Sequence, residues 1–237
     1  MQAMIFSAGL GTRFKPWTDK HPKALAAVNG KSLLQRNIEY LQGFGINDVV
    51  VNVHHFADQV VDTIHRHQGW GSKVTISDET DALLETGGGL KKATPLLTTD
   101  TIVLMNVDIL TDLDLDKMIA YHHQHQALAT LAISNRTTSR YFLFDDDNTL
   151  CGWKNIKTGE ERISRQVTPL HAKAFSGVHV IQKKLLSLIQ KEGRLGIVDL
   201  YLELAKTNTL KGFQHNYDHF VDVGKPEAIV VAEKMFP

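Results

Sequence analysis

The chain of 237 residues has little cysteine and no excess of charge of either sign. Its one cysteine, Cys151, excludes an internal disulfide and is typical of a reducing compartment. Lys and Arg together number 26, as do Asp and Glu, so no overall field draws the protein to nucleic acid or an anionic membrane. No apolar run is long enough to span a bilayer, and no signal peptide precedes Met4. We therefore expect a cytoplasmic protein without nucleic-acid or membrane partners, in which phosphate binding is local.

The stretch 4–25, MIFSAGLGTRFKPWTDKHPKAL, is the most informative part of the chain. Its opening apolar run predicts a buried strand, and glycines follow where the strand ends. Gly9 and Gly11 can adopt backbone angles closed to other residues, so successive N–H groups can point into one concavity that suits phosphate oxygens. Arg13 and Lys23 add positive charge. The stretch therefore predicts a loop that binds a polyphosphate.

Two other glycine-loop motifs do not fit these letters. A dinucleotide fingerprint, GxGxxG, needs a third glycine where this chain has Phe14. A Walker P-loop ending at Gly30-Lys31-Ser32 needs a glycine at the position of Leu25. A glycine-rich turn with scattered surface charge explains a lone GxG, but it accounts less well for Arg13 and Lys23 behind a strand.

The rest of the chain alternates apolar strand patterns with amphipathic helix patterns and then turns mostly to strands. This order predicts one α/β domain over 1–237, with a mixed, mainly parallel central sheet flanked by helices and with ligands at the C-terminal ends of the strands. The predicted strands are 3–6, 48–53, 73–77, 101–106, 127–134, 141–144, 150–154 and 173–181, and the predicted helices are 32–42, 56–67, 90–97, 115–125, 183–191, 198–206 and 226–235.

Polar and glycine residues interrupt this pattern at several points. The glycines 87–89 precede a predicted helix and fit either a flexible hinge or main chain that lies against a base or ribose. Asp108 follows an apolar strand, where a carboxylate needs a counter-ion such as a divalent cation shared with substrate phosphates. The segment 112–114, DLD, is a competing metal motif, but Asp114 fits better as the cap of the next helix. The histidines that end this helix, 122–125, are expected to be solvated.

Several of these motifs carry a family resemblance. SAGLGTRFKP with PKAL behind it resembles the signature loop of the sugar-1-phosphate nucleotidyltransferases, also called nucleotide-sugar pyrophosphorylases; Ser7, where the family usually has Ala, is a conservative departure. The segment 84–89, LETGGG, is similar to an element of short uridylyltransferases that act on amino-sugar phosphates, and 220–226, FVDVGKP, is similar to the DVGTP step. The resemblance implies a Rossmann-like, GT-A-like fold with a nucleotide-binding half, 1–110, and a sugar-phosphate-binding half, 111–237.

The resemblance also implies site residues. Arg13, Lys23 and Asp108 are the expected catalytic residues, and Asp108 and Asp222 are expected to bind Mg²⁺. The residues expected to bind the nucleotide are Ala8, Gly9, Leu10, Gly11, Thr12, Arg13, Lys23, Glu85, Gly87 and Gly88. Those expected to contact the sugar phosphate are Asn106, Arg140 and Gly177, with Trp153 and Lys154 as further candidates in the segment 136–165, which departs from the common pattern.

The expected reaction is the Mg²⁺-dependent transfer of a nucleoside monophosphate from an NTP to a sugar 1-phosphate. The short length and LETGGG favour UTP with an amino-sugar or muramic-type phosphate. Mannose- or heptose-1-phosphate guanylyl transfer and phosphocholine cytidylyl transfer are alternatives. An NDP-sugar-dependent glycosyltransferase needs less loop charge than Arg13 and Lys23 supply. A nucleotide-sensing module does not need both metal carboxylates.

Overall fold

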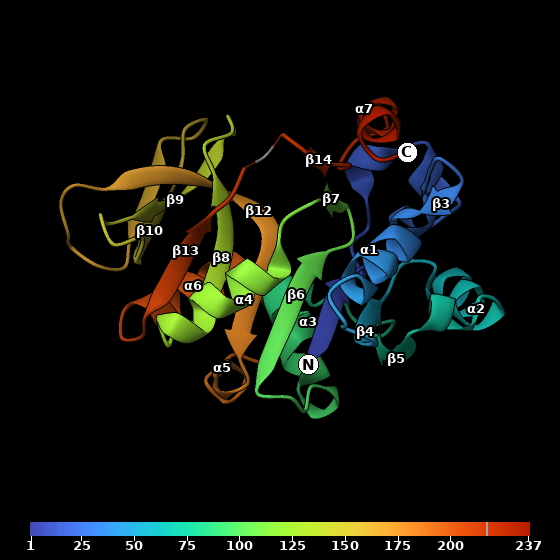
Figure 1. Ribbon diagram of the computed structural model, residues 1–237, viewed down its shortest axis with the longest axis horizontal. Helices are drawn as coiled ribbons and strands as arrows, with labels where there is room; N and C mark the ends of the chain where they lie inside the picture. The colour runs from blue at the N-terminus through green and yellow to red at the C-terminus, as the bar shows by residue number, and fades with distance from the viewer. Residues whose placement is uncertain (217) are drawn as a thin grey trace.

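A ten-stranded mixed sheet forms the centre of the computed structural model, which describes residues 1–216 and 218–237 (Figure 1). Its strands are β1 (Gln2–Phe6), β4 (Asp48–Val53), β5 (Lys73–Asp78), β6 (Thr101–Asn106), β8 (Ala129–Ser134), β9 (Arg140–Phe144), β10 (Leu150–Asn155), β11 (Glu160–Ile163), β12 (His171–Gln182) and β13 (Leu210–Gln214). Two short ribbons lie outside it: β2 (Ala27–Val28) with β3 (Lys31–Ser32), and β7 (Ile109–Thr111) with β14 (Phe220–Asp222). The helices are α1 (Leu33–Gln42), α2 (Ala57–Arg66), α3 (Glu85–Ala93), α4 (Leu115–Gln124), α5 (Lys184–Ser187), α6 (Ile197–Ala205) and α7 (Ala228–Met235).

The strand order is β11-β10-β9-β12-β6-β1-β4-β5, with β8 paired to both β12 and β13. The strands β6, β1, β4 and β5 are mutually parallel, whereas β12 runs antiparallel to β6, β8 and β9. The predicted α/β fold with a mixed sheet flanked by helices is therefore confirmed. The strands β11 and β13 were not predicted, because EERI and LKGFQ lack the apolar alternation that marks a strand.

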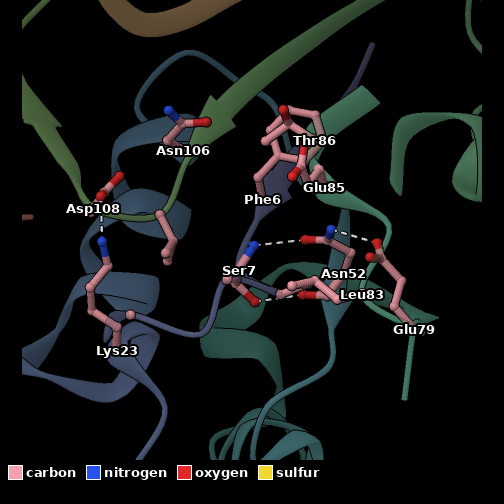
Figure 2. A pocket seen from close by; sticks show the side chains of 14 residues that line it. Phe6, Ser7, Lys23, Asn52, Glu79, Leu83, Glu85, Thr86, Asn106 and Asp108 are labelled. Carbon is pink, nitrogen blue, oxygen red and sulfur yellow. Dashed lines mark hydrogen bonds and ion pairs between the residues drawn. The ribbon is translucent and has the colours of Figure 1, made fainter. Parts of the chain in front are cut away.

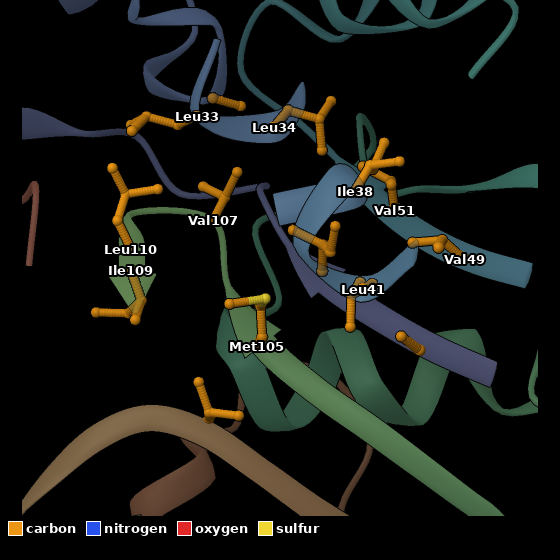
Figure 3. Packing of buried hydrophobic residues seen from close by; sticks show 14 of the residues in the cluster. Leu33, Leu34, Ile38, Leu41, Val49, Val51, Met105, Val107, Ile109 and Leu110 are labelled. Atoms are coloured by element: carbon orange, nitrogen blue, oxygen red, sulfur yellow. The ribbon is translucent and has the colours of Figure 1, made fainter. Parts of the chain in front are cut away.

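Each face of the sheet carries its own hydrophobic core. Along β1, Ala3 and Ile5 face one core and Met4 and Phe6 face the other, because successive side chains of a strand point to opposite faces. The first core is closed by α1, α2 and α4, and the second by α3, α5 and α6. Figure 3 shows the first core, where the apolar side of α1 packs on β4 and β6. Burial on both faces explains why these strands read as continuous apolar runs.

Helix ends follow the predicted chemistry in two places. Ser32 caps α1, since its hydroxyl accepts a hydrogen bond from the Gln35 N–H at 3.1 Å. Asp114 caps α4, since its carboxylate accepts from the Lys117 N–H at 3.0 Å, which confirms the cap over the metal motif for this residue. No helix in the described part of the chain is both long and apolar enough to cross a membrane.

The end of α4 differs from the prediction. His122 is buried rather than solvated, and its Nδ1 lies 2.9 Å from the Thr130 hydroxyl oxygen. Burial, with a smaller contribution from His123, lowers the pKa of His122 to about 4. The segment 121–126, YHHQHQ, does not reveal which imidazole faces the sheet; the contact with β8 decides it. Of these three histidines only His123 is exposed as expected, and His125 is half-buried.

Candidate active site

A cavity of about 350 Å³ opens where the parallel strands end (Figure 2). We call it the first cavity. The residues that line it all fall within 6–108, and they lie near the C-terminal ends of β1, β4, β5 and β6, in the loops that follow these strands or in the first turn of α3: Phe6, Ser7, Ala8, Gly9, Gly11, Lys23, Asn52, Glu79, Leu83, Glu85, Thr86, Asn106, Val107 and Asp108. Parallel sheets place ligand sites at this edge.

The glycine loop after β1 is held open by its own backbone. Gly11 has φ of 60°, and a Cβ there would lie 2.8 Å from the Thr18 methyl group, so glycine is required. Its carbonyl accepts from the Phe14 N–H at 2.7 Å and the Thr18 hydroxyl at 2.9 Å. Within the part of the chain that the structure describes, the N–H groups of residues 9–12 donate to no acceptor. These donors are available to an anion. Phosphate binding by this loop stays a prediction.

Two carboxylates and two cations meet beside this loop. Lys23 Nζ donates to Asp108 Oδ2, and both side chains are largely buried, at 13% and 15% exposure. Asp222 is brought to Asp108 by the β7–β14 ribbon, in which it pairs with Ile109, and the Val223 N–H donates to the Asp108 carbonyl at 2.8 Å. The predicted metal carboxylates thus converge although they are far apart in sequence.

The charges around Asp222 affect its ionisation. Although Asp222 lies on the exposed rim, loss of hydration and the negative charge of Asp108 raise its carboxyl pKa, while Lys23 and Arg13 act in the opposite direction. Gly224 leaves room for the side chains of both Asp222 and Arg13, since a Cβ on this glycine would lie 2.8 Å from Asp222 Oδ1 and 3.1 Å from Arg13 Nη2. Arg13, Lys23, Asp108 and Asp222 therefore form one charged cluster.

This cluster suits a divalent cation that is shared with a substrate. The described residues contain no group of three or more His, Cys, Asp and Glu side chains that could hold a metal alone. Mg²⁺ commonly binds through one or two carboxylates and completes its ligand set with phosphate oxygens and water. Asp108 already holds a cationic partner in Lys23, and the pKa of Asp222 is raised first by loss of hydration and then by the negative charge of Asp108. The pair Asp108 and Asp222 fits such an ion.

Three polar residues at the floor of the first cavity were not predicted as site residues (Figure 2). The Ser7 N–H donates to Asn52 Oδ1 at 2.7 Å, and the Ser7 hydroxyl donates to the Asn52 carbonyl at 2.6 Å. Asn52 Nδ2 in turn donates to Glu79 Oε1 at 2.7 Å. Ser7 therefore has a structural role that Ala could not fill. The signal in the sequence was Asn52 itself, a polar residue inside the buried run VVVNV.

The glycines 87–89 do not precede a helix, because α3 begins at Glu85 and contains all three. The N–H groups of Gly87 and Gly88 both donate to the Leu195 carbonyl, at 2.8 and 3.0 Å. A Cβ on Gly88 would lie 2.3 Å from the Gly193 carbonyl oxygen. Gly87 and Gly88 allow α3 to pack against 193–196, and Gly89 leaves room for Asn52 and Glu79, so a flexible hinge does not describe this segment. Contact of Gly87 and Gly88 with the nucleotide stays a prediction. Of the predicted residues in this segment, Glu85 lines the first cavity, joined there by Thr86.

Two of the predicted sugar contacts lie together. Gly177, in the bulged middle of β12, has φ of 74°, and a Cβ there would lie 3.1 Å from Asn106 Nδ2 and 2.7 Å from Ile109 Cγ1. A side chain at position 177 would therefore displace Asn106 from its place at the end of β6.

A second cavity, of about 690 Å³, is lined mainly by the other half of the chain. Its lining residues are Arg13, Arg136, Thr138, Ser139, Arg140, Phe142, Trp153, Asn155, Lys157, Thr158, Phe175, Val198 and Asp222. Arg140 and Trp153 lie here as the prediction for a sugar pocket requires, whereas Lys154 is not part of the lining. Arg136, also missed, donates to the Phe175 carbonyl at 2.7 Å, and burial lowers its pKa. The second cavity shares Arg13 and Asp222 with the charged cluster.

Comparison with known proteins gives a consistent match over the whole chain. The sequence matches the family described as "Nucleotidyl transferase" over residues 2–235. It is 29% identical over 237 residues to N-acetylmuramate alpha-1-phosphate uridylyltransferase of Caulobacter vibrioides, covering 98% of this chain and 95% of that one. It is 25% identical to mannose-1-phosphate guanyltransferase of Yarrowia lipolytica over 235 residues, covering 96% of this chain and 61% of that one.

Solved structures match the fold. HddC from Yersinia pseudotuberculosis, in complex with GMP-PN, has a TM-score of 0.78 at 22% identity and covers 100% of this chain and 99% of its own. A putative glucose-1-phosphate thymidylyltransferase from Bacillus anthracis has a TM-score of 0.83 at 17% identity and covers 99% of this chain and 94% of its own. At these identities the likeness concerns the fold.

Proposed function

The chain belongs to the nucleotidyl transferase family, and on this premise we propose that it transfers a nucleoside monophosphate from an NTP to a sugar 1-phosphate. The observation that carries the proposal is the charged cluster of Arg13, Lys23, Asp108 and Asp222, which adjoins a loop of available N–H groups and borders both cavities. One cavity for each substrate, with charge compensation where they meet, is the arrangement that this reaction needs.

The glycine loop would bind the triphosphate. The N–H groups of residues 9–12 are its donors, with Ala8 on the wall of the first cavity. Arg13 would neutralise the departing pyrophosphate, and Lys23 would contact the α-phosphate or the attacking phosphate, since its ammonium lies at the cavity beside Asp108. Fixed donors and cations placed before the reaction stabilise developing charge without reorganisation.

Asp108 and Asp222 would hold Mg²⁺. The bound ion would supply charge neutralisation at the phosphate oxygens. Lys23, which pairs with Asp108, would also lie where it can contact the substrate phosphates.

The chemistry requires positioning more than proton transfer. A phosphate oxygen of the sugar 1-phosphate, already ionised at neutral pH, forms a bond to the α-phosphorus, and the bond from that phosphorus to the bridging oxygen breaks. Pyrophosphate leaves with both electrons of the broken bond, so atoms and charge balance without a general base. The residues of the cluster bring two polyanions together and offset their repulsion.

The first cavity would take the nucleotide and the second the sugar, which corresponds to halves at 1–110 and 111–237. Asn106 and Gly177 would contact the sugar at the boundary, and Arg140 would contact it within the second cavity. The relative from Caulobacter supports UTP and N-acetylmuramate 1-phosphate as the substrates. The guanyltransferase relative supports GTP with mannose 1-phosphate as the second candidate. The single free cysteine supports a cytoplasmic setting.

The test is release of pyrophosphate with Mg²⁺, measured for four NTPs against a panel of sugar 1-phosphates and phosphocholine. We expect release only when UTP and an amino-sugar 1-phosphate are both present. The reverse assay, an NDP-sugar with pyrophosphate, should form NTP. Consumption of an NDP-sugar by an acceptor without pyrophosphate chemistry would instead identify a glycosyltransferase, and tight nucleotide binding without turnover would identify a sensor.

A further inference from the structure

Strand β12 joins the two parts of the sheet (Figure 1). Its residues 178–182 pair with β6, whose end borders the first cavity, whereas 171–173 pair with β9, which borders the second. Against β8 the register of β12 shifts between Phe175 and His179, so the strand is bulged at this junction. A bulge bends its strand and leaves residues outside the ladder, so its shape depends on other contacts. The shape of this bulge therefore helps to set how the two cavities are placed relative to each other.

Three consecutive residues of the bulge connect the two cavities. Phe175 lines the second cavity. Gly177 leaves room for Asn106, which lines the first cavity, since a Cβ at position 177 would lie 3.1 Å from Asn106 Nδ2. Ser176 lies between them in the chain, is 1% exposed and lines neither cavity. A displacement of Ser176 would therefore move the wall of one cavity and the edge of the other.

The hydroxyl group of Ser176 is held by His215, which follows β13 directly. His215 is 9% exposed, and its Nε2 lies 2.8 Å from Ser176 Oγ. The Asn216 carbonyl contacts Nδ1 and can only accept, so Nδ1 carries the proton and Nε2 accepts from the serine. Burial lowers the pKa of His215, which favours this neutral ring. The His215 N–H donates to the Ile133 carbonyl at 3.0 Å, so β8 fixes the backbone from which the ring reaches the bulge.

A second side chain holds the same bulge, and both lie against β14. Arg136 donates to the Phe175 carbonyl at 2.7 Å, and its guanidinium lies over the Phe220 ring at 5.2 Å. The His215 ring lies 6.2 Å from the same Phe220 ring, measured between centroids. Phe220 precedes Asp222 by two residues in β14. The contacts that hold the bulge thus also tie it to the strand that carries a carboxylate of the charged cluster.

We infer that His215 is a positioning residue for the transfer reaction, which through Ser176 fixes the bulge of β12 and so holds the sugar phosphate in line with the nucleotide. His215 lines neither cavity, so it acts through the bulge and not on a substrate. In-line attack depends on alignment, and a misplacement of about 1 Å can lower the rate on the order of 100-fold. This inference rests on the proposed function, because it concerns the alignment of the same two substrates.

A set of variants of this one hydrogen bond tests the inference. His215→Asn withdraws the acceptor from Ser176, and we expect kcat to fall about 10- to 100-fold while KM for the NTP stays unchanged. Ser176→Ala removes only the hydroxyl and should give the same loss. His215→Gln can place its side-chain oxygen near the position of Nε2 and should restore most of the rate. The double variant Ser176→Ala with His215→Asn should lose no more than either single variant, because both act through one bond.

His219→Asn is the matched control. His219 lies in the same connection between β13 and β14 but is exposed, and its Nδ1 lies 3.0 Å from Asp112 Oδ2. The substitution is the same as at position 215 and leaves the bulge untouched. Turnover and both KM values should therefore stay at the wild-type level in His219→Asn.

Binding separates this inference from the proposed function. UDP-N-acetylmuramate would occupy both cavities, whereas UTP would occupy the first, and calorimetry of either needs no turnover. We expect His215→Asn to bind UDP-N-acetylmuramate about 10-fold more weakly and UTP as wild type does. If this difference appears while no acceptor yields pyrophosphate, the proposed reaction falls alone. Equal losses for the two ligands, or no loss for either, would overturn the role of His215 and leave the proposed reaction intact.

Thermal unfolding distinguishes positioning from a purely structural bond. Loss of a buried hydrogen bond should lower the melting temperature of Ser176→Ala in either case. A positioning role requires in addition the fall in kcat and the weaker binding of UDP-N-acetylmuramate, measured where the variant is fully folded. A folded Ser176→Ala protein that melts lower but keeps wild-type kcat would show that the bond between Ser176 and His215 contributes to stability alone.

Discussion

The first and second cavities are built in different ways. The first is lined by one continuous half of the chain, at the ends of parallel strands, and its polar floor of Ser7, Asn52 and Glu79 is buried and bonded in a fixed arrangement. The second is lined by antiparallel strands and distant segments, and two of its cations, Arg140 and Lys157, are exposed. A fixed polar floor suits the recognition of a flat base, because little ordering entropy is lost on binding. Exposed cations suit a charged sugar phosphate, because attraction between charges does not require the cations to match the shape of the sugar.

The largest expected effect lies in the charged cluster, whose Lys23 and Asp108 line the first cavity and whose Arg13 and Asp222 line the second. Arg13→Ala should lower kcat by a factor on the order of 10² to 10³, because it removes a cation from the developing pyrophosphate charge. Its side chain is exposed, so the melting temperature should stay within about 2 °C of wild type. Pyrophosphate release and thermal unfolding measure the two quantities.

Lys15→Ala is the control for this change, since Lys15 is another exposed cation of the same loop and pairs with Asp19 at 2.9 Å. It should keep wild-type turnover. An Arg13→Ala protein that is unfolded would assign the arginine a structural role instead.

A smaller effect should separate the two cavities. Arg140→Gln should raise KM for the sugar phosphate about 10-fold, the loss typical of a charge-assisted hydrogen bond, and leave KM for the NTP unchanged. Lys154→Gln, on the neighbouring strand β10 and outside the cavity lining, should change neither. Steady-state kinetics with each substrate varied in turn would measure both KM values for both variants. A change in KM for the NTP would contradict the division of substrates between the cavities.

The smallest effect concerns acid stability, where the two halves should respond in opposite directions. Burial lowers the pKa of His122 to about 4 and that of His179 to about 3. A histidine with a lowered folded-state pKa contributes stability above its ordinary pKa of about 6.5, and this is lost as pH falls toward the folded value. As pH falls through this range, the free energy of unfolding should therefore decrease by up to about 1.4 kcal/mol per pH unit for each imidazole. Glu79 has the opposite effect, because burial raises its pKa and its contribution to stability is lost as pH rises.

Urea unfolding at a series of pH values measures this slope. His122→Asn should remove the share of His122 and flatten the curve, whereas His123→Asn, at the exposed neighbour, should leave it near wild type. A His122→Asn protein that loses stability in acid as steeply as wild type would contradict the assignment.

Local chemistry made most of the elements and part of the candidate site predictable. The loop of Gly9 and Gly11 with Arg13 and Lys23 was predicted from the sequence alone, because phosphate binding by backbone donors needs glycine and charge close together in sequence. The caps at Ser32 and Asp114 were found for the same reason, since a cap and its helix are neighbours in the chain. The parallel strands were visible because burial on both faces leaves a continuous apolar run.

The predictions that missed concern contacts between distant segments. The packing of Gly87 and Gly88 depends on 193–196, a segment more than a hundred residues later in the chain that lies against α3. The burial of His122 depends on β8. No residue near these glycines or near His122 in the sequence indicates such a partner. A hinge and a solvated helix end were therefore reasonable local interpretations.

The sequence by itself determined the fold class, and it predicted a glycine loop for phosphate and two acidic residues for a metal. Only the tertiary structure decided that Asp222 reaches Asp108 through the β7–β14 ribbon, and that Ser7, Asn52 and Glu79 form one hydrogen-bonded floor. The physical reason is the distance along the chain over which each interaction acts. Helix periodicity, caps and glycine angles act between neighbours in the chain, whereas desolvation and hydrogen-bond satisfaction depend on everything that folding brings to the same place.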